Sequence, residues 1–265
     1  MSGLALITGA SSGIGRAFAE RLAADGVDLI VVARRRDRLA KLAASLPGVH
    51  VEVIAADLGT DDGIDEVASV CAARPLTTIV NNAGVAHYMP MAELPAAKAR
   101  ELIQVKVAAP TLLTRAALPA MIERGSGTIV NVAGMIAFAG PAPVAPYQLR
   151  AGRAVYTGTL AHTVAMTQSL HAELDGTGVT AHVVCPGIVA TEFHEVQGMD
   201  LSAYPRMSAA DVVTAALAGV ELGEVVIAPG VKDYALLETV FRSDLAAFHG
   251  QSPQLASRYQ HDGPA

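Results

Sequence analysis

The chain has 265 residues, 52% of them hydrophobic, a formal net charge of −6 and a pI near 5.7. This size and composition predict one α/β domain, and the negative charge argues against nucleic acid or an anionic membrane surface as the main partner. Two cysteines, Cys71 and Cys185, make no disulfide framework and lack zinc-site neighbours, so no metal is expected.

The first predicted strand begins at residue 4, which leaves no room for a signal peptide. No apolar run reaches about 18 residues. We therefore expect a cytoplasmic protein that does not span a membrane.

Residues 4–16 predict a strand, a tight turn and a helix in succession. Leu4–Thr8 is a short apolar run, and an amphipathic helix is expected from Arg16 to about Asp25. Three glycines lie between them, spaced Gly-x-x-x-Gly-x-Gly: Gly9, Gly13 and Gly15. Such glycines permit unusual backbone angles, let a pyrophosphate approach bare backbone, and allow close packing of helix on strand. The helix N-terminus adds N–H groups for a phosphate, so a dinucleotide site is predicted here.

The second strand, expected over 27–33, ends at arginines. Sites for NAD usually place an acid at the end of this strand, where it binds the ribose 2′-OH. Here that position is Ala33, followed by Arg34 and Arg35. Guanidinium groups clamp a 2′-phosphate, so we expect NADP(H), with Arg34 as the main contact and Arg35 as the second. The alternative is that the arginines only start a solvated helix.

The rest of the chain alternates strands and helices. Further strands are expected over 49–55, 77–80, 127–132, 179–185 and 224–228, and helices over 60–73, 96–124, 154–175 and 208–221. Pro110 and Pro119 predict that the helix over 96–124 is kinked or broken. The pattern is typical of an α/β fold with a Rossmann-type, doubly wound parallel sheet of about seven strands. We expect this domain over 1–250, with a substrate loop at 192–207 and a tail at 251–265.

Several motifs follow strand ends, where ligands bind in such sheets. They are Thr8-Gly-x-x-x-Gly-Ile-Gly15, Asp57, Asn81-Asn-Ala-Gly84, Asn131-Val, and Pro186-Gly187-x-x-x-Thr191. In this order, over nearly the whole chain, they resemble the short-chain dehydrogenase/reductases. Asp57 alone reads equally well as a helix N-cap.

The resemblance implies a nicotinamide cofactor, a small-molecule substrate, and a homodimer or homotetramer. It implies that Ile14 and the glycines lie at the pyrophosphate, Asn82 and Ala83 near the adenosine, and Ile188 and Thr191 at the carboxamide. The full set expected at the cofactor is Gly9, Ser11, Ser12, Gly13, Ile14, Gly15, Arg34, Arg35, Asp57, Leu58, Asn82, Ala83, Gly84, Pro186, Gly187, Ile188 and Thr191.

The catalytic positions depart from the family. A tyrosine acid/base matches Tyr156, but the family lysine four residues later is Leu160 here, and the family serine is Gly134. The family asparagine that holds a relay water aligns with Lys106. We hypothesise that Lys106 replaces the missing cation and tunes Tyr156, which protonates the substrate oxygen; alternatively, Lys106 has no role.

The spacing from the preceding strand indicates a second candidate for the catalytic tyrosine. Asn131 lies 25 residues before Tyr156, whereas the family spacing of about 16 would select Tyr147, in an apparent insertion near 144–153. The helix after Tyr156 matches the family better, so Tyr147 is the second candidate. Three functions remain open: an oxidoreductase of a small, largely apolar carbonyl or alcohol, an NADP(H)-binding protein without turnover, and a lyase or isomerase.

The substrate pocket is expected from two segments, 87–95 and 192–207. They carry His87, Tyr88, Met89, Met91, Phe193, His194, Met199 and Tyr204. Their side chains predict a largely apolar pocket with a few polar groups.

Overall fold

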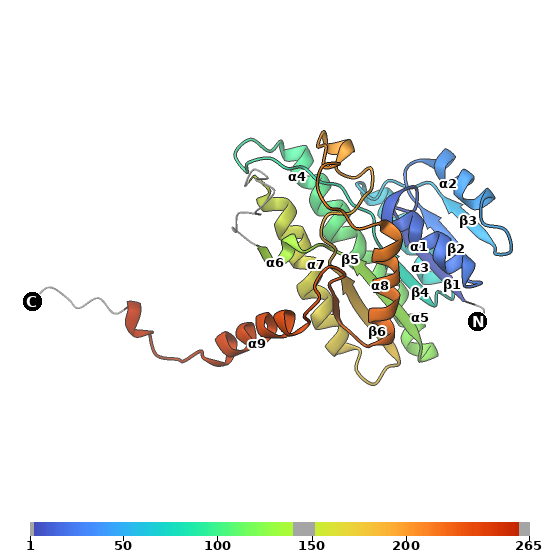
Figure 1. The fold of residues 1–265 in the computed structure, drawn as a ribbon. Helices are drawn as coiled ribbons and strands as arrows, with labels where there is room; N and C mark the ends of the chain where they lie inside the picture. Colours follow the sequence, from blue (N-terminus) through green and yellow to red (C-terminus); the bar gives the residue numbers. More distant parts are fainter. Residues whose placement is uncertain (1–2, 140–151, 260–265) are drawn as a thin grey trace, which may run out of the picture. The chain divides into compact units, whose positions relative to one another are not determined.

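The computed structural model describes residues 3–139 and 152–259, and the chain divides between Gly230 and Val231 into two compact units. The first unit contains a seven-stranded parallel sheet in the order β3-β2-β1-β4-β5-β6-β7 (Figure 1). Its strands are β1 (Leu4–Thr8), β2 (Asp28–Val32), β3 (Val51–Ile54), β4 (Thr78–Asn81), β5 (Gly127–Val132), β6 (Val179–Val184) and β7 (Val226–Ile227). The predicted Rossmann-type sheet is confirmed.

Helices cover both faces of this sheet (Figure 1). They are α1 (Gly13–Ala24), α2 (Arg36–Ala44), α3 (Asp61–Ala73), α4 (Ala96–Ile103), α5 (Ala109–Arg124), α6 (Ile136–Ala139), α7 (Ala154–Glu173) and α8 (Ala209–Glu221). Alternate residues of β1 serve opposite layers: Ala5 and Ile7 pack towards α1 and α8, whereas Leu6 packs towards α3 and α5. Burial on both faces explains why the central strands are continuous apolar runs.

The helix over 96–124 is continuous but not regular. A π-helical stretch, Gln104–Ala108 (η1), joins α4 to α5 and carries Lys106. Pro110 follows this stretch, and α5 continues past Pro119 to Arg124. The regular α-helical pattern is therefore interrupted next to Pro110, whose missing N–H cannot donate within the helix. By length and composition this helical run could cross a membrane, and 44% of its most apolar window is buried inside the protein.

Helix α1 also begins earlier than expected, at Gly13 rather than Arg16. The glycine turn therefore passes directly into the helix, whose first N–H groups lie beside the turn. The second unit contains α9 (Ala235–His249) and a short turn, Ser257–Tyr259, in its described part. The boundary expected near residue 250 stays a prediction.

Candidate active site

One large cavity opens where the strand order reverses between β1 and β4, the usual ligand site of such sheets. Its volume is about 690 Å³. All residues expected at the cofactor line it except Gly15, which lies behind the turn. Sequence-distant motifs therefore form one site, as the strand-end positions predicted.

The glycine-rich turn has the shape that the spacing requires. Gly9 and Gly13 have φ of +69° and +55°, values that favour glycine. A Cβ at Gly15 would lie 2.5 Å from the carbonyl oxygen of Gly9, so the helix and the turn can touch only without a side chain. The turn is thus a bare backbone cradle beside a helix N-terminus, which fits a pyrophosphate.

The hydroxyl of Thr8 fixes the second cofactor motif to the first. It accepts hydrogen bonds from the N–H groups of Asn82 and Ala83, both at 2.9 Å. The Asn82 side chain donates back to the carbonyl of Thr8 at 3.0 Å. Beneath it, Asn81 donates to the fully buried Asn131 at 2.9 Å. Asn131 therefore braces adjacent strands and does not line the cavity.

The arginine end of the cavity brings together guanidinium groups, hydroxyls and one carboxylate. The Arg35 guanidinium donates to the hydroxyls of Ser11, at 2.9 and 3.2 Å, and Ser12, at 3.0 Å. A carboxylate of the loop after β6, Glu192, lies 2.6 Å from Arg35 and 2.7 Å from Arg38. Burial opposes ionisation of Glu192, but hydrogen bonds from Arg38, Arg35 and Ser12 outweigh it and lower its pKa to about 2.

Arg34 takes a different position from Arg35. It is more exposed and lies 3.6 Å from Glu101 of α4, which also contacts His87 at 2.8 Å. Arg35 is therefore the arginine that contacts the two serines, although both arginines line the cavity. Asp57 lines it too, and the N-cap of α3 is Thr60, whose hydroxyl accepts from the N–H of Gly63. This rules out Asp57 as that cap.

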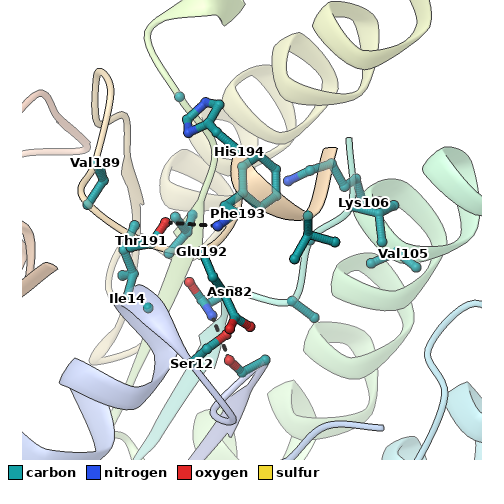
Figure 2. Close-up of a pocket in the computed structure, with 18 of the residues that line it drawn as sticks. Ser12, Ile14, Asn82, Val105, Lys106, Val189, Thr191, Glu192, Phe193 and His194 are labelled. Atoms are coloured by element: carbon teal, nitrogen blue, oxygen red, sulfur yellow. Dashed lines mark hydrogen bonds between the residues drawn. The ribbon is translucent and has the colours of Figure 1, made fainter. Parts of the chain in front are cut away.

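Tyr156 and Lys106 meet at the other end of the cavity. Lys106 Nζ lies 5.6 Å from the centre of the Tyr156 ring, and both residues are buried. Leu160 lines the wall where the family lysine would stand, and Gly134 lies nearby without a hydroxyl. Figure 2 shows Lys106 extending from its helix into the cavity towards Phe193. The hypothesis that Lys106 reaches Tyr156 from another helix agrees with this arrangement.

Burial controls the protonation of both groups. It lowers the pKa of Lys106 from 10.5 to about 8. It raises the pKa of Tyr156 well above 10, and the neighbouring phenol of Tyr88 raises it further. The expected lowering of the Tyr156 pKa by Lys106 is therefore absent from this arrangement. Tyr156 keeps its proton, and Lys106 is the group that titrates near neutral pH.

A family model described as short chain dehydrogenase matches residues 3–201. The chain belongs to the short-chain dehydrogenase family. Among its relatives, an uncharacterized oxidoreductase, YmfI, of Bacillus subtilis is 35% identical over 72% of this chain and 76% of its own length. Sulfoacetaldehyde reductase 2 of Chromohalobacter salexigens is 36% identical over 73% of this chain and 75% of its own length. A short chain dehydrogenase of Pseudocercospora fijiensis is 35% identical, and the match spans 60% of that protein's length.

Solved structures extend this likeness to almost the whole chain. A short-chain dehydrogenase from Sphingobium yanoikuyae in complex with NADPH has a TM-score of 0.89 at 32% identity, covering 97% of this chain and 100% of that one. The bulky-bulky ketone specific alcohol dehydrogenase from Comamonas testosteroni has a TM-score of 0.85 at 28% identity, covering 97% and 98%. The fold is thus that of a nicotinamide-dependent oxidoreductase.

The remaining site predictions for this short-chain dehydrogenase have mixed outcomes. Tyr147 falls at 140–151, outside the described residues. Three of the eight residues expected in the substrate pocket line the cavity: Tyr88, Phe193 and His194. The other five do not, and Met91 is 68% exposed; the five are His87, Met89, Met91, Met199 and Tyr204. Glu192 was missed, although it directly follows Thr191 in a cofactor motif. Only the fold brings its carboxylate to two arginines more than 150 residues earlier.

Proposed function

We propose that this short-chain dehydrogenase is an NADP(H)-dependent reductase of small, largely apolar carbonyl compounds, in which Tyr156 donates the proton and Lys106 supplies the positive charge beside it. The observation that carries the proposal is the meeting of these two side chains in the cavity that the cofactor motifs also line. Lys106 replaces in function the lysine that the family carries at the position of Leu160.

The cavity offers donors suited to each part of the cofactor. The glycine-rich turn and α1 would hold the pyrophosphate, and Arg35 with Ser11 and Ser12 would bind the 2′-phosphate. Ile188 and Thr191 would lie at the nicotinamide. When bound, NADPH supplies the hydride. NADP(H) is favoured over NAD(H) because Ala33 stands where an acid would bind a free 2′-OH.

The protonation states favour reduction over oxidation. Tyr156 keeps its proton, so its hydroxyl can donate to a carbonyl oxygen that gains negative charge but is a poor base for an alcohol. The ammonium of Lys106, 5.6 Å from the centre of the tyrosine ring, stabilises that charge. At pH 7 most of this ammonium is present, because its pKa is about 8.

The substrate end of the cavity is mainly apolar. It is lined by Val85, Tyr88, Met135, Ile136, Phe193 and His194. Such walls favour aliphatic or aromatic groups beside the carbonyl. The names of two relatives, a sulfoacetaldehyde reductase and a ketone specific alcohol dehydrogenase, agree with a carbonyl substrate. From the family resemblance we further expect a cytoplasmic homodimer or homotetramer.

A second candidate is an NADP(H)-binding protein without turnover. It is favoured by the absence of both the family serine and the family lysine, at Gly134 and Leu160. The third, a lyase or isomerase step on the same scaffold, would form product with no net change in cofactor.

The first test is a thermal-shift titration with NADPH, NADP⁺, NADH and NAD⁺, followed by an NADPH-oxidation screen with apolar aldehydes and ketones. A ligand that binds the native state raises its melting midpoint. We expect larger shifts with the phosphorylated pair and slow NADPH consumption. Shifts without consumption would select the second candidate, and no shift with any nucleotide would overturn the redox proposal.

Matched variants assign the result to residues. Arg35→Ala should lose the preference for the phosphorylated pair, whereas Arg36→Ala should keep it, because Arg36 is exposed and outside the cavity lining. Tyr156→Phe should remove turnover but keep the NADPH shift. Tyr259→Phe, an exposed tyrosine outside the lining, is the control for the loss of a hydroxyl.

A further inference from the structure

Lys106 is an unusual lysine for this chain. The sequence has four lysines, and Lys41, Lys98 and Lys232 are exposed, whereas Lys106 is 8% exposed. Among the described residues no carboxylate forms an ion pair with it. A buried ammonium without a counter-ion is costly, so burial favours the neutral amine.

The Lys106 side chain lines a cavity whose walls around it carry several apolar side chains. A Cβ at Gly84 would lie only 3.0 Å from Nζ, so the missing side chain there leaves room for the lysine. Figure 2 shows the side chain extending into the cavity towards Phe193, and apolar side chains line the same space. With a pKa of about 8, roughly a tenth of the amine is neutral at pH 7, against less than 0.1% for an ordinary lysine near 10.4.

We propose that Lys106 is also an amine nucleophile, which condenses with an apolar aldehyde or ketone in the cavity to form an imine. The nitrogen lone pair attacks the carbonyl carbon, and a carbinolamine forms. The carbon–oxygen bond then breaks and the oxygen leaves as water, taking the two hydrogens that the amine loses. No oxidant, reductant or nucleotide is needed, so this reactivity goes beyond the proposed hydride transfer and is independent of it.

Reductive trapping tests the proposal on the full chain without nucleotide. The protein is incubated briefly at pH 7 with 3-phenylpropanal and sodium cyanoborohydride, which reduces an imine to a stable secondary amine. Peptide mapping by mass spectrometry then gives the labelling rate at each lysine. We expect Lys106 to be labelled about tenfold or more faster than each exposed lysine, because of its larger neutral fraction. Labelling of Lys106 no faster than Lys98, in a protein shown to be folded, would overturn the proposal.

Two controls keep the result specific. Lys106→Arg should lose the fast label and keep the slow labelling of the three exposed lysines. In urea that unfolds the chain, the preference for Lys106 should disappear, because the cavity is lost. A preference that persists in the unfolded chain would come from local sequence and would overturn the proposal. Failure of NADPH turnover has no bearing on these outcomes, since no nucleotide is present.

Discussion

The Glu192 carboxylate lies 2.6 Å from the Arg35 guanidinium and so joins the loop after β6 to the start of α2 in the wall of the cavity. The same carboxylate holds Arg38 at 2.7 Å. Its pKa of about 2 keeps it ionised at every pH at which the protein would work. A permanent negative charge therefore lies among the arginines expected to bind a 2′-phosphate.

This charge should weaken binding of a 2′-phosphate, so Glu192→Gln should bind adenosine 2′,5′-bisphosphate several-fold more tightly. Arg35 stays oriented in the variant by Ser11 and Ser12. Titration calorimetry measures the effect, with 5′-AMP as the ligand that lacks the 2′-phosphate and should change little. Glu195→Gln, an exposed acid in the same loop, is the matched control. Weaker binding of the bisphosphate would mean that Glu192 holds the arginine in place instead.

Removing the buried amine should stabilise the fold, so Lys106→Met should unfold at higher urea concentration at pH 7. The pKa of Lys106 is lowered from 10.5 to about 8 in the folded chain, so the folded chain holds this proton less tightly than the unfolded chain does. Below pH 8 this difference reduces the free energy of unfolding by about 3 kcal/mol. This loss of stability declines as the pH rises from 8 to 10.5, so the difference in stability between Lys106→Met and the unchanged protein should shrink over that pH range. Lys98→Met, at an exposed position of α4, should show no such trend.

The rate of carbonyl reduction should fall as the pH rises through about 8. Above that pH Lys106 loses the proton whose charge the proposed reaction uses, while Tyr156 stays protonated. The profile of kcat/KM against pH gives this break. In Lys106→Arg the break should be absent up to pH 10, since a guanidinium keeps its proton. A break at the same pH in that variant would assign the titration to another group.

Stability should also decline on the acid side, because of a histidine in β6. His182 is buried, and among the described residues nothing hydrogen-bonds its Nε2. Burial lowers its pKa below 6.5, despite the hydrogen bond to the carbonyl of Glu224. As the pH falls below 6.5 the unfolded chain takes up a proton that the folded chain refuses, so folding weakens. His182→Gln should flatten this decline in urea titrations, whereas His162→Gln, at an exposed position, should not.

Two glycine substitutions should have opposite effects. Gly15→Ala forces a Cβ to 2.5 Å from the backbone carbonyl of Gly9, so the turn must shift, and nucleotide binding and the melting midpoint should both fall. Gly158→Ala places its Cβ in open space on α7 and should raise stability by about 0.5–1 kcal/mol. Differential scanning calorimetry with and without NADPH checks both. Equal effects of the two would show that close packing at Gly15 is unimportant.

The sequence predicted the sheet and the family, and all but one of the residues that it nominated for the cofactor line the cavity. These predictions succeeded because the relevant signals are local: apolar runs give strands, and each motif directly follows a strand whose end lies at one edge of the sheet. Gly9, Asn82 and Thr191 come together for this reason.

Features that depend on distant packing were not predictable in the same way. The pairing of Glu192 with Arg35 and Arg38 needs the β6 loop to return to the start of α2. The high pKa of Tyr156 depends on burial and on the hydroxyl of Tyr88, neither of which has a local signature. The π-helical stretch before Pro110 was not predictable, because a proline indicates that a helix is irregular but not which hydrogen-bond pattern the neighbouring turn adopts.

The π-helical stretch Gln104–Ala108 has an evolutionary consequence for the cavity. A π-helical turn arises when one residue is added to an α-helix, and each residue advances a regular α-helix by about 100°. Deleting a single residue within this stretch would let the helix become regular and would change the direction in which the Lys106 side chain points. One codon gained or lost in this turn could therefore create or abolish the amine of the site.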